Sequence, residues 1–357
     1  MYTIEMIEGK RNGGRLPEQF CEENYEKVNE FHRGSETPLV KLEETAKICG
    51  AAAVYIKDES KRYGLNAFKA LGAMYAVHNI VEKLEEGEKP MFVTATDGNH
   101  GKAVAWAASS CGCTSAVFMP AGTVPARSEA IASIEGASVF VTDLNYDDAV
   151  RKALEYSKEH DGIFVQDTGF EGYEDIPWDI TIGYTRMISE AINQLGGIRP
   201  THVFLQAGVG SMAGGITGYL TDRFGEECPV ISVMEAVESA CIFESVKQGR
   251  YVAIGGKPRT IMAGLNCGEA NVLTLPVLEN HVSFFFKVPD FVTEDGMRQL
   301  ADEGVVAGEC GGIGTGLLLN LTDEMKRRLG IDENSVILLF STEGDTDPES
   351  YERIVNR

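Results

Sequence analysis

Short runs of apolar, β-branched and aromatic residues alternate along the chain with longer runs of helical periodicity. The short runs predict strands and the longer ones predict helices. The predicted strands are residues 52–58, 91–96, 115–120, 138–143, 163–167, 202–207, 229–235 and 335–342. The predicted helices are residues 70–86, 102–111, 126–136, 146–160, 179–196, 214–225 and 294–304. Such alternation is typical of parallel sheets covered by helices, so we expect an α/β fold.

The domain organisation follows from the spacing of these elements. No low-complexity linker and no short internal repeat interrupts the pattern. Between about residues 72 and 188, four strand–helix units follow one another. We expect a smaller domain at 72–188, inserted into a larger domain built from 1–71 and 189–357.

Charge and composition narrow the class of partner. The chain has 357 residues, with Lys+Arg 32 against Asp+Glu 54 and a net charge of −22. This balance argues against nucleic-acid and anionic-membrane partners, which need clustered Lys and Arg. No secretory signal and no apolar run of about 18–20 residues is present, so we expect a cytoplasmic protein. The dispersed cysteines predict no metal site, and a pairing of Cys241 with Cys267 stays open.

A glycine-rich turn, GVGSMAGG at 208–215, lies between a predicted strand and a predicted helix. Successive backbone N–H groups at such a turn bind phosphate, and glycine lets the anion approach closely. The next predicted strand ends at Glu235, where a dinucleotide-binding fold places its ribose-binding acid. The spacing differs from GxGxxG, however. A nicotinamide oxidoreductase and a non-catalytic sensor of a phosphate ligand both stay open at this point.

Lys69 begins an apolar, small-residue-rich helix after the polar segment DESKRYGLN. Its neighbours Phe68 and Ala70 predict a partly desolvated amine. Desolvation lowers the pKa of a lysine and makes it a nucleophile or a base. The alternative is an ordinary surface lysine at a helix start.

Four motifs together resemble a known family. NAFK (66–69), TDGNHG (96–101), GVGSMAGG (208–215) and LLFSTEG (338–344) match, in order and spacing, the motifs of the tryptophan-synthase-β-like, fold type II pyridoxal-phosphate enzymes. Longer segments such as TATDGNHGKAVAWAA and VQDTGFEGYEDIP are similar to one branch, the diaminopropionate ammonia-lyases. The resemblance implies two three-layer α/β domains, an active site in the cleft between them, and a homodimer.

The resemblance also implies how the cofactor, pyridoxal 5'-phosphate, is held. Lys69 binds it covalently as an imine and acts as a base on one face of the substrate, with Phe68 beside it. Asn99 donates to its phenolic oxygen, and Ser341, or alternatively Thr342, meets its pyridine nitrogen. The phosphate-binding residues are Gly208, Val209, Gly210, Ser211, Met212, Ala213 and Gly214.

Two acids distinguish this chain from its dehydratase relatives, which carry a small residue where Asp97 stands. The resemblance implies that Asp97 lies opposite Lys69 and takes the α-proton of the other enantiomer, with Asp167 as a second acid. Carboxylates attract a β-ammonium group, and an acid helps an amine leave protonated. The structural alternatives are a helix N-cap for Asp97 and a turn residue for Asp167.

With these residues, the resemblance implies α,β-elimination of D- or L-2,3-diaminopropionate to pyruvate and ammonia. Serine, threonine or N-substituted diaminopropionate stay open as substrates, because Gly169-Phe170 and the position of Trp178 depart from the pattern of the lyase. We expect His100 to be structural. The substrate-binding residues expected are Thr96, Asp97, Gly98, Asp167 and Tyr173, with Trp178 and Tyr184 closing the pocket and Glu309 and Cys310 near the cofactor.

Overall fold

A computed structural model describes residues 3–256 and 258–357, which form two sheets. The larger sheet has five parallel central strands and an antiparallel strand at each edge. Its order is β1 (Glu5–Glu8), β10 (Phe284–Val288), β9 (Val230–Ala236), β8 (His202–Gln206), β11 (Val336–Ser341), β3 (Ala53–Asp58) and β2 (Leu39–Lys41). The smaller sheet is parallel throughout, in the order β6 (Ala137–Val141), β5 (Thr114–Met119), β4 (Met91–Ala95) and β7 (Ile163–Phe164).

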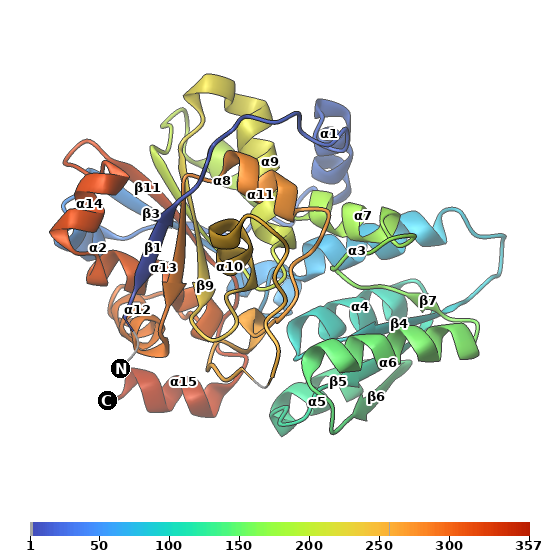
Figure 1. The fold of residues 1–357 in the computed structure, drawn as a ribbon. Helices are drawn as coiled ribbons and strands as arrows, with labels where there is room; N and C mark the ends of the chain where they lie inside the picture. The colour runs from blue at the N-terminus through green and yellow to red at the C-terminus, as the bar shows by residue number, and fades with distance from the viewer. Residues whose placement is uncertain (1–2, 257) are drawn as a thin grey trace.

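The central strands of the larger sheet bury side chains on both faces. Val203 and Leu205 of β8 pack into one core and Phe204 packs into the other, as alternation along a strand requires. Helices cover both faces and make three layers (Figure 1). The first core includes α1 (Glu22–Phe31), α8 (Thr185–Gln194), α9 (Ser211–Phe224), α10 (Cys241–Gln248) and α11 (Leu275–His281). The second includes α2 (Glu43–Cys49), α12 (Asp290–Asp302), α13 (Glu309–Asn320) and α14 (Asp323–Leu329).

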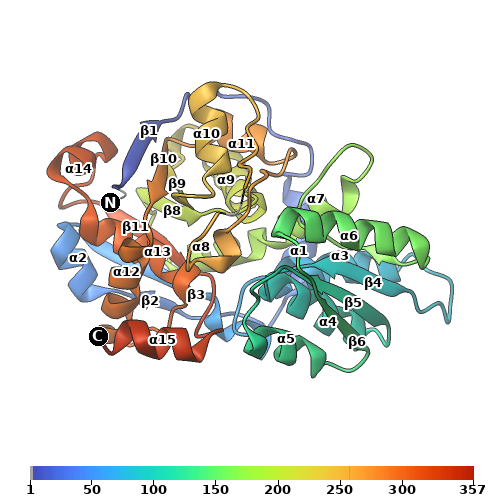
Figure 2. The same cartoon turned by 60° about the horizontal axis from the view of Figure 1, so that its bottom comes forward.

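The smaller sheet also lies between two helical layers. Figure 2 shows α6 (Tyr146–Glu159) on one face, and α4 (Asn99–Ser110) and α5 (Pro125–Ala132) on the other. The C-terminal helix α15 (Pro348–Val355) packs against α12 of the larger unit. None of the helices in the described part of the chain is long and apolar enough to cross a membrane.

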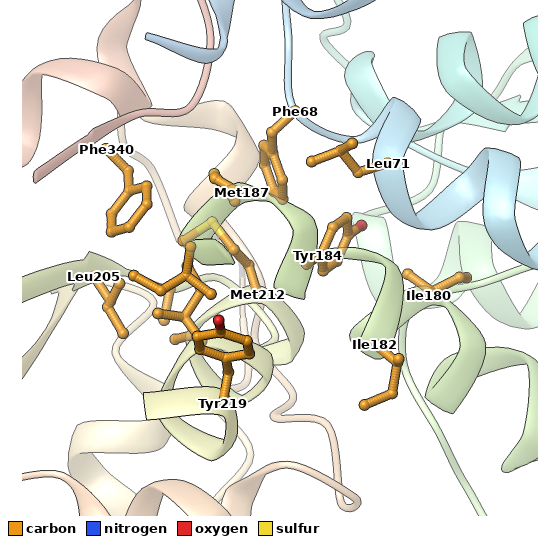
Figure 3. Packing of buried hydrophobic residues seen from close by; sticks show 14 of the residues in the cluster. Phe68, Leu71, Ile180, Ile182, Tyr184, Met187, Leu205, Met212, Tyr219 and Phe340 are labelled. Carbon is orange, nitrogen blue, oxygen red and sulfur yellow. The ribbon is translucent and has the colours of Figure 1, made fainter. Parts of the chain in front are cut away.

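Close helix packing joins the segment around Lys69 to the rest of the molecule. Helix α3 (Ala70–Val81) crosses α7 (Asp175–Gly183) where a Cβ on Gly72 would lie 2.6 Å from the carbonyl oxygen of Ile180. Phe68, directly before α3, contacts Tyr184 with ring centroids 4.9 Å apart. Figure 3 shows this contact beside Met187. Such packing leaves little freedom for the chain on either side of Lys69.

The predicted α/β fold class and all eight predicted strands are confirmed. The prediction omits the edge strands β1 and β2, which are only four and three residues long, and it omits β10, although its three phenylalanines are typical of a buried strand. The single helix predicted at 179–196 is wrong, because the chain forms α7 and α8 with a break at Tyr184. The domain boundaries at residues 72 and 188 stay a prediction.

Candidate active site

A cavity lies where strand ends of the two sheets meet. Strands β4, β8 and β11 end just before the turns that line it, as ligand sites in parallel sheets do. The lining residues are Phe68, Lys69, Asp97, Asn99, His100, Tyr146, Asp167, Gln206, Ala207, Gly208, Val209, Gly210, Ser211, Met212, Ala213, Gly264, Leu265, Cys267, Cys310, Thr342 and Glu343. Most of the residues predicted for cofactor and catalysis therefore come together in one place.

Lys69 extends into this cavity from the N-terminus of α3, and its side chain is 20% exposed. Its Nζ forms an ion pair with Asp167 Oδ2 and lies 5.2 Å from the ring centroid of Phe68. Burial lowers the pKa of Lys69, but the carboxylate of Asp167 outweighs this effect, so the pKa is raised above its ordinary value. The predicted lowering is wrong because the sequence does not show that a residue 98 positions away pairs with the amine.

Asp97 lines the cavity from the turn between β4 and α4. The cap residue of α4 is Gly98, and within the described residues no side chain caps this helix, so the N-cap alternative for Asp97 is wrong. Burial raises the pKa of Asp97 to about 6, while the nearby guanidinium of Arg127 lowers it. A carboxylate with such a pKa is a base at neutral pH that can also carry a proton.

Thr96 and Gly98 shape this turn. The hydroxyl of Thr96 accepts a hydrogen bond from the backbone N–H of Gly98 at 2.8 Å, and Thr96 is fully buried. Gly98 has φ +157° and ψ −74°, a conformation that favours glycine, and a Cβ there would also lie 3.0 Å from Cδ of Arg127. Neither residue is among those that line the cavity within the described chain. Their predicted contact with substrate stays a prediction.

Asp167 follows β7 and is held by both side chain and main chain. Its carbonyl oxygen accepts hydrogen bonds from the hydroxyl of Ser211 and from Nδ2 of Asn271, the latter at 3.1 Å. Burial raises the pKa of Asp167, but the ammonium of Lys69 reverses this, so its pKa is lowered. Its Oδ1 is buried without a hydrogen-bond partner among the described residues, which leaves an acceptor free for a ligand.

Asn271 is a residue that the sequence did not single out. It is fully buried, and its Oδ1 accepts from the backbone of Gly169 at 3.1 Å while its Nδ2 donates to Ser211 Oγ at 2.8 Å. It therefore joins the segment after Asp167 to the glycine-rich turn. No motif marks it, because its importance comes only from what it contacts.

The glycine-rich turn has the geometry of a phosphate site. Helix α9 begins at Ser211, and the preceding Gly210 has φ +95°, a left-handed conformation that favours glycine. A Cβ on Gly208 would lie 2.8 Å from the carbonyl oxygen of Gly264. Ser211, Met212 and Ala213 line the cavity from the first turn of the helix, where backbone N–H groups are free for an anion. Gly214 packs against Thr274, whose Cβ would lie 2.5 Å from an added Cβ.

The structure distinguishes Ser341 from Thr342. Ser341 donates its hydroxyl to the carbonyl oxygen of Glu343 at 3.3 Å, whereas Thr342 lines the cavity. Gln206 Nε2 donates to Thr342 Oγ1 at 3.0 Å, so the hydroxyl hydrogen of Thr342 is free to point into the cavity. A hydroxyl donor fits a pyridine nitrogen. The geometry therefore favours the alternative, Thr342, and Gln206 is a second residue that the sequence did not indicate.

The three aromatic residues predicted to line or close the pocket, Tyr173, Trp178 and Tyr184, are not among the described residues that line the cavity. The hydroxyl of Tyr173 donates to the carbonyl oxygen of Phe164 at 2.9 Å and accepts from the backbone of Gln166 at 2.8 Å. Phe170 stacks on Tyr173 and is 36% exposed. Trp178 makes an edge contact with Phe20 at 5.8 Å. Tyr173, with Phe170 stacked on it, therefore braces residues 164–166 just before Asp167, whereas Trp178 packs against Phe20.

His100 and Tyr184 are buried residues that contact the segments carrying Asp167 and Lys69. His100 is buried with Nε2 3.1 Å from the carbonyl oxygen of Val165, and burial lowers its pKa, which agrees with a structural role. The ring centroid of Tyr184 lies 5.7 Å from Nζ of Lys69. Cys310 lines the cavity, and Glu309, which begins α13, lines an adjoining cavity.

Two open points from the sequence are resolved by side-chain contacts. Glu235 accepts hydrogen bonds from the backbone N–H groups of Ile242 at 2.9 Å and Phe243 at 2.6 Å. Its carboxylate therefore caps α10 and is not free to bind a ribose, which removes the main support for a nicotinamide enzyme.

Cys241 and Cys267 are both free thiols. In the described part of the chain, no group of three His, Cys, Asp or Glu residues has metal-binding geometry.

The cavity fits pyridoxal phosphate at three points. The first turn of α9 provides backbone donors for a phosphate, Thr342 a hydroxyl for the pyridine nitrogen, and Lys69 an amine for covalent attachment. The unpartnered Oδ1 of Asp167 and the carboxylate of Asp97 remain for the substrate.

Comparison with known proteins agrees with this geometry. Residues 31–342 match the family of pyridoxal-phosphate dependent enzymes. The chain is 38% identical over 383 residues to diaminopropionate ammonia-lyase of Escherichia coli (strain K12), covering 99% of this chain and 96% of the relative. It is 41% identical over 354 residues to the enzyme of that name from Salmonella typhimurium (strain LT2), covering 89% and 87%.

A solved structure extends the likeness to three dimensions. The Escherichia coli diaminopropionate ammonia lyase, crystallised in complex with an aminoacrylate-PLP azomethine reaction intermediate, matches with a TM-score of 0.92 at 38% identity, covering 99% of this chain and 97% of that one. The chain therefore belongs to the pyridoxal-phosphate-dependent enzymes of fold type II and, within them, to the family of the diaminopropionate ammonia-lyases.

Proposed function

We propose that the protein catalyses α,β-elimination of ammonia from 2,3-diaminopropionate, giving pyruvate and ammonia. The observation that carries the proposal is the convergence of two carboxylates, Asp97 and Asp167, on the cavity that also holds the amine of Lys69. Carboxylates attract a substrate with a cationic β-ammonium group, whereas a β-hydroxyl would gain nothing comparable.

The reaction breaks two bonds of the substrate. Bound pyridoxal phosphate supplies the electron sink for the electron pair left at Cα. Lys69 removes the α-proton from one face, and Asp97 removes it from the other face, so each base serves one enantiomer. The bond from Cβ to nitrogen then breaks; the carboxylate of Asp167 holds the β-nitrogen as its ammonium form, so the nitrogen keeps the electron pair of the bond and leaves as neutral ammonia. The released aminoacrylate takes up water and yields pyruvate and a second ammonia.

The state of Lys69 and Asp167 fits these roles. With the two groups paired, Lys69 carries a proton and Asp167 carries none. Covalent attachment of the cofactor needs a free amine, so this proton leaves Nζ before the imine forms, and Oδ2 of Asp167 is the acceptor that is paired with it.

Absorption and turnover test the proposal. The purified protein should be yellow, and borohydride should abolish the visible band by reducing the bond between Lys69 and the cofactor. Diaminopropionate of both configurations should yield pyruvate faster than D- or L-serine does, and threonine should yield little ketobutyrate. A colourless protein that cannot be reconstituted with pyridoxal phosphate, or one that prefers serine, would overturn the proposal.

Elimination from N-substituted diaminopropionate is a second candidate. An adjoining cavity of about 630 Å³ shares Asp97 and Tyr146 with the inner cavity, so a substituent on the β-nitrogen has space on that side. The rate of elimination from N-substituted diaminopropionate, compared with the rate from diaminopropionate itself, would decide between the two substrates.

We also expect a homodimer in the cytoplasm, as the family resemblance implies. Light scattering after size exclusion and fractionation of the source cells test these two points.

A further inference from the structure

Glu343 is a buried acid of the cavity wall; it lies in the segment LLFSTEG, but the resemblance assigned it no role. It follows Thr342 at the end of β11 and is 3% exposed. Its main chain is held by the N–H of Gly308, which donates to its carbonyl oxygen at 2.9 Å. The carboxylate therefore has a defined direction, into the space between the two sheets.

The two oxygens of this carboxylate bind helices that belong to different sheets, α13 of the larger sheet and α4 of the smaller one. Oε1 accepts a hydrogen bond at 3.1 Å from the backbone N–H of Cys310, in the first turn of α13. Oε2 accepts a hydrogen bond from Nδ2 of Asn99, the first residue of α4. Thr346 adds a contact to Oε2 at 3.4 Å. Glu343 thus joins the turn that carries Asp97 to a helix N-terminus on the larger sheet.

An asparagine amide has two nearly isosteric ends with opposite hydrogen-bonding character. A carboxylate only accepts, so the end of Asn99 that faces Glu343 must be the nitrogen. One N–H of Nδ2 is then used, and the other is free for a ligand in the cavity. Arg127 lies near both Glu343 and Asp97; burial lowers the pKa of its guanidinium, but these two acids outweigh that effect and raise it above its ordinary value.

We propose that Glu343 is a positioning residue, which fixes the amide of Asn99 with its nitrogen toward the phenolic oxygen of the bound cofactor. The inference rests on the proposed function in one respect, that Asn99 contacts that oxygen. Without Glu343 the amide can turn, and its oxygen would then face the phenolic oxygen. Two acceptors in contact repel each other, so the cofactor would lose a donor and gain an unfavourable neighbour.

Glu343→Gln tests the orientation directly, because glutamine has one acceptor and one donor. It cannot accept from both Cys310 and Asn99, so one of these hydrogen bonds is lost. We expect a shifted visible absorption band of the holoenzyme without substrate, and a kcat lower by roughly 10- to 100-fold, the loss expected for one hydrogen bond to a charged group. KM should change much less than kcat, because Glu343 acts through the cofactor contact.

A double-mutant cycle separates positioning from a purely structural role. If Glu343 acts through Asn99, adding Glu343→Gln to Asn99→Ala should not shift the band or lower kcat beyond Asn99→Ala alone. Additive effects in the cycle, or a band left unchanged by Glu343→Gln, would overturn the proposal. Glu235→Gln is the matched control, since Glu235 is also a buried acid that binds a helix N-terminus, and it should leave the band unchanged.

A second pair of variants gives a readout independent of the reaction. Asn99→Asp places two acceptors face to face and should lower the melting temperature of the holoenzyme. Adding Glu343→Gln supplies a donor, so the double variant should melt higher than Asn99→Asp. A further drop on adding Glu343→Gln would contradict the contact. Neither the absorption band nor the melting temperature needs substrate. A failure of the inference about Glu343 therefore leaves the proposed turnover of diaminopropionate standing, and a failure of that turnover leaves the inference about Glu343 standing.

Discussion

Two strand-to-helix turns meet in the active site and offer different groups to a ligand. The turn at 208–214 follows β8 and offers backbone N–H groups, with no acid among its side chains. The turn at 96–101 follows β4 and offers the side chains of Asp97 and Asn99. Glycines make room for neighbours in both turns, since an added Cβ would lie 2.5 Å from Cβ of Thr274 at Gly214 and 2.3 Å from Cγ2 of Thr96 at Gly101.

The difference shows which changes each turn tolerates. A turn that binds through its backbone is sensitive to added volume and to conformation. A turn that works through side chains is sensitive to the identity of one or two of them, because each holds or donates a proton at a fixed place. We therefore expect variants of the turn at 208–214 to weaken cofactor binding, and variants of the turn at 96–101 to slow the reaction.

The largest effect should come from Asp97→Asn. We expect turnover of D-diaminopropionate to fall by roughly 10²- to 10⁴-fold, the usual contribution of a general base. Turnover of the L-isomer, for which Lys69 is the base, and the visible band should change little. Steady-state kinetics on both isomers measure the effect, and equal losses on the two would contradict the assignment of Asp97 to one face.

Gly214→Val should act on the other turn. The added side chain meets Thr274 at 2.5 Å, and such overpacking costs about 1–3 kcal/mol, or roughly 5- to 150-fold in cofactor affinity. Titration of the apoenzyme with pyridoxal phosphate measures this. Gly255→Val is the matched control, because within the described chain a Cβ there meets nothing within 4 Å. Equal affinities of the two variants would show that close packing at this turn is unimportant.

The pH dependence should separate the enantiomers. Burial raises the pKa of Asp97 to about 6, so it is a carboxylate above that pH and a protonated acid below it. The rate with the D-isomer should therefore fall about tenfold per pH unit below 6, and the rate with the L-isomer should show no such limb. Arg127→Met removes a charge that lowers this pKa and should move the limb to higher pH; an unmoved limb would assign it to another group.

The smallest effect should distinguish two adjacent hydroxyls. Thr342→Val removes the donor expected at the pyridine nitrogen and should lower kcat about 5- to 10-fold, as for one neutral hydrogen bond. Ser341→Ala removes a hydroxyl that binds only the carbonyl oxygen of Glu343 and should have little effect. The reverse order would restore Ser341 as the residue at the nitrogen.

Much of this site follows from local sequence. Lys69 and the residues 208–213 lie in contiguous motifs, and the structure brings them together in one cavity, while the roles expected for them stay predictions. Asn271 and Gln206 could not be predicted, since each is a single polar residue without a motif. Glu343 lies in the motif LLFSTEG, but its contact with Asn99 is visible only in the tertiary structure. Tyr173 was predicted from its place beside Asp167, but its hydroxyl bonds to the main chain.

By itself, the sequence determined the fold class, the cofactor and the family, because alternating elements and contiguous motifs are local features of the chain. Only the tertiary structure decided which polar atoms meet. It paired Lys69 with Asp167, used Glu235 as a helix cap, and placed Thr342 rather than Ser341 at the cavity. It also brought Glu343 to Asn99, 244 positions away. The physical reason is that pKa and hydrogen bonding depend on distance and burial, which neighbours in space set and neighbours in sequence do not.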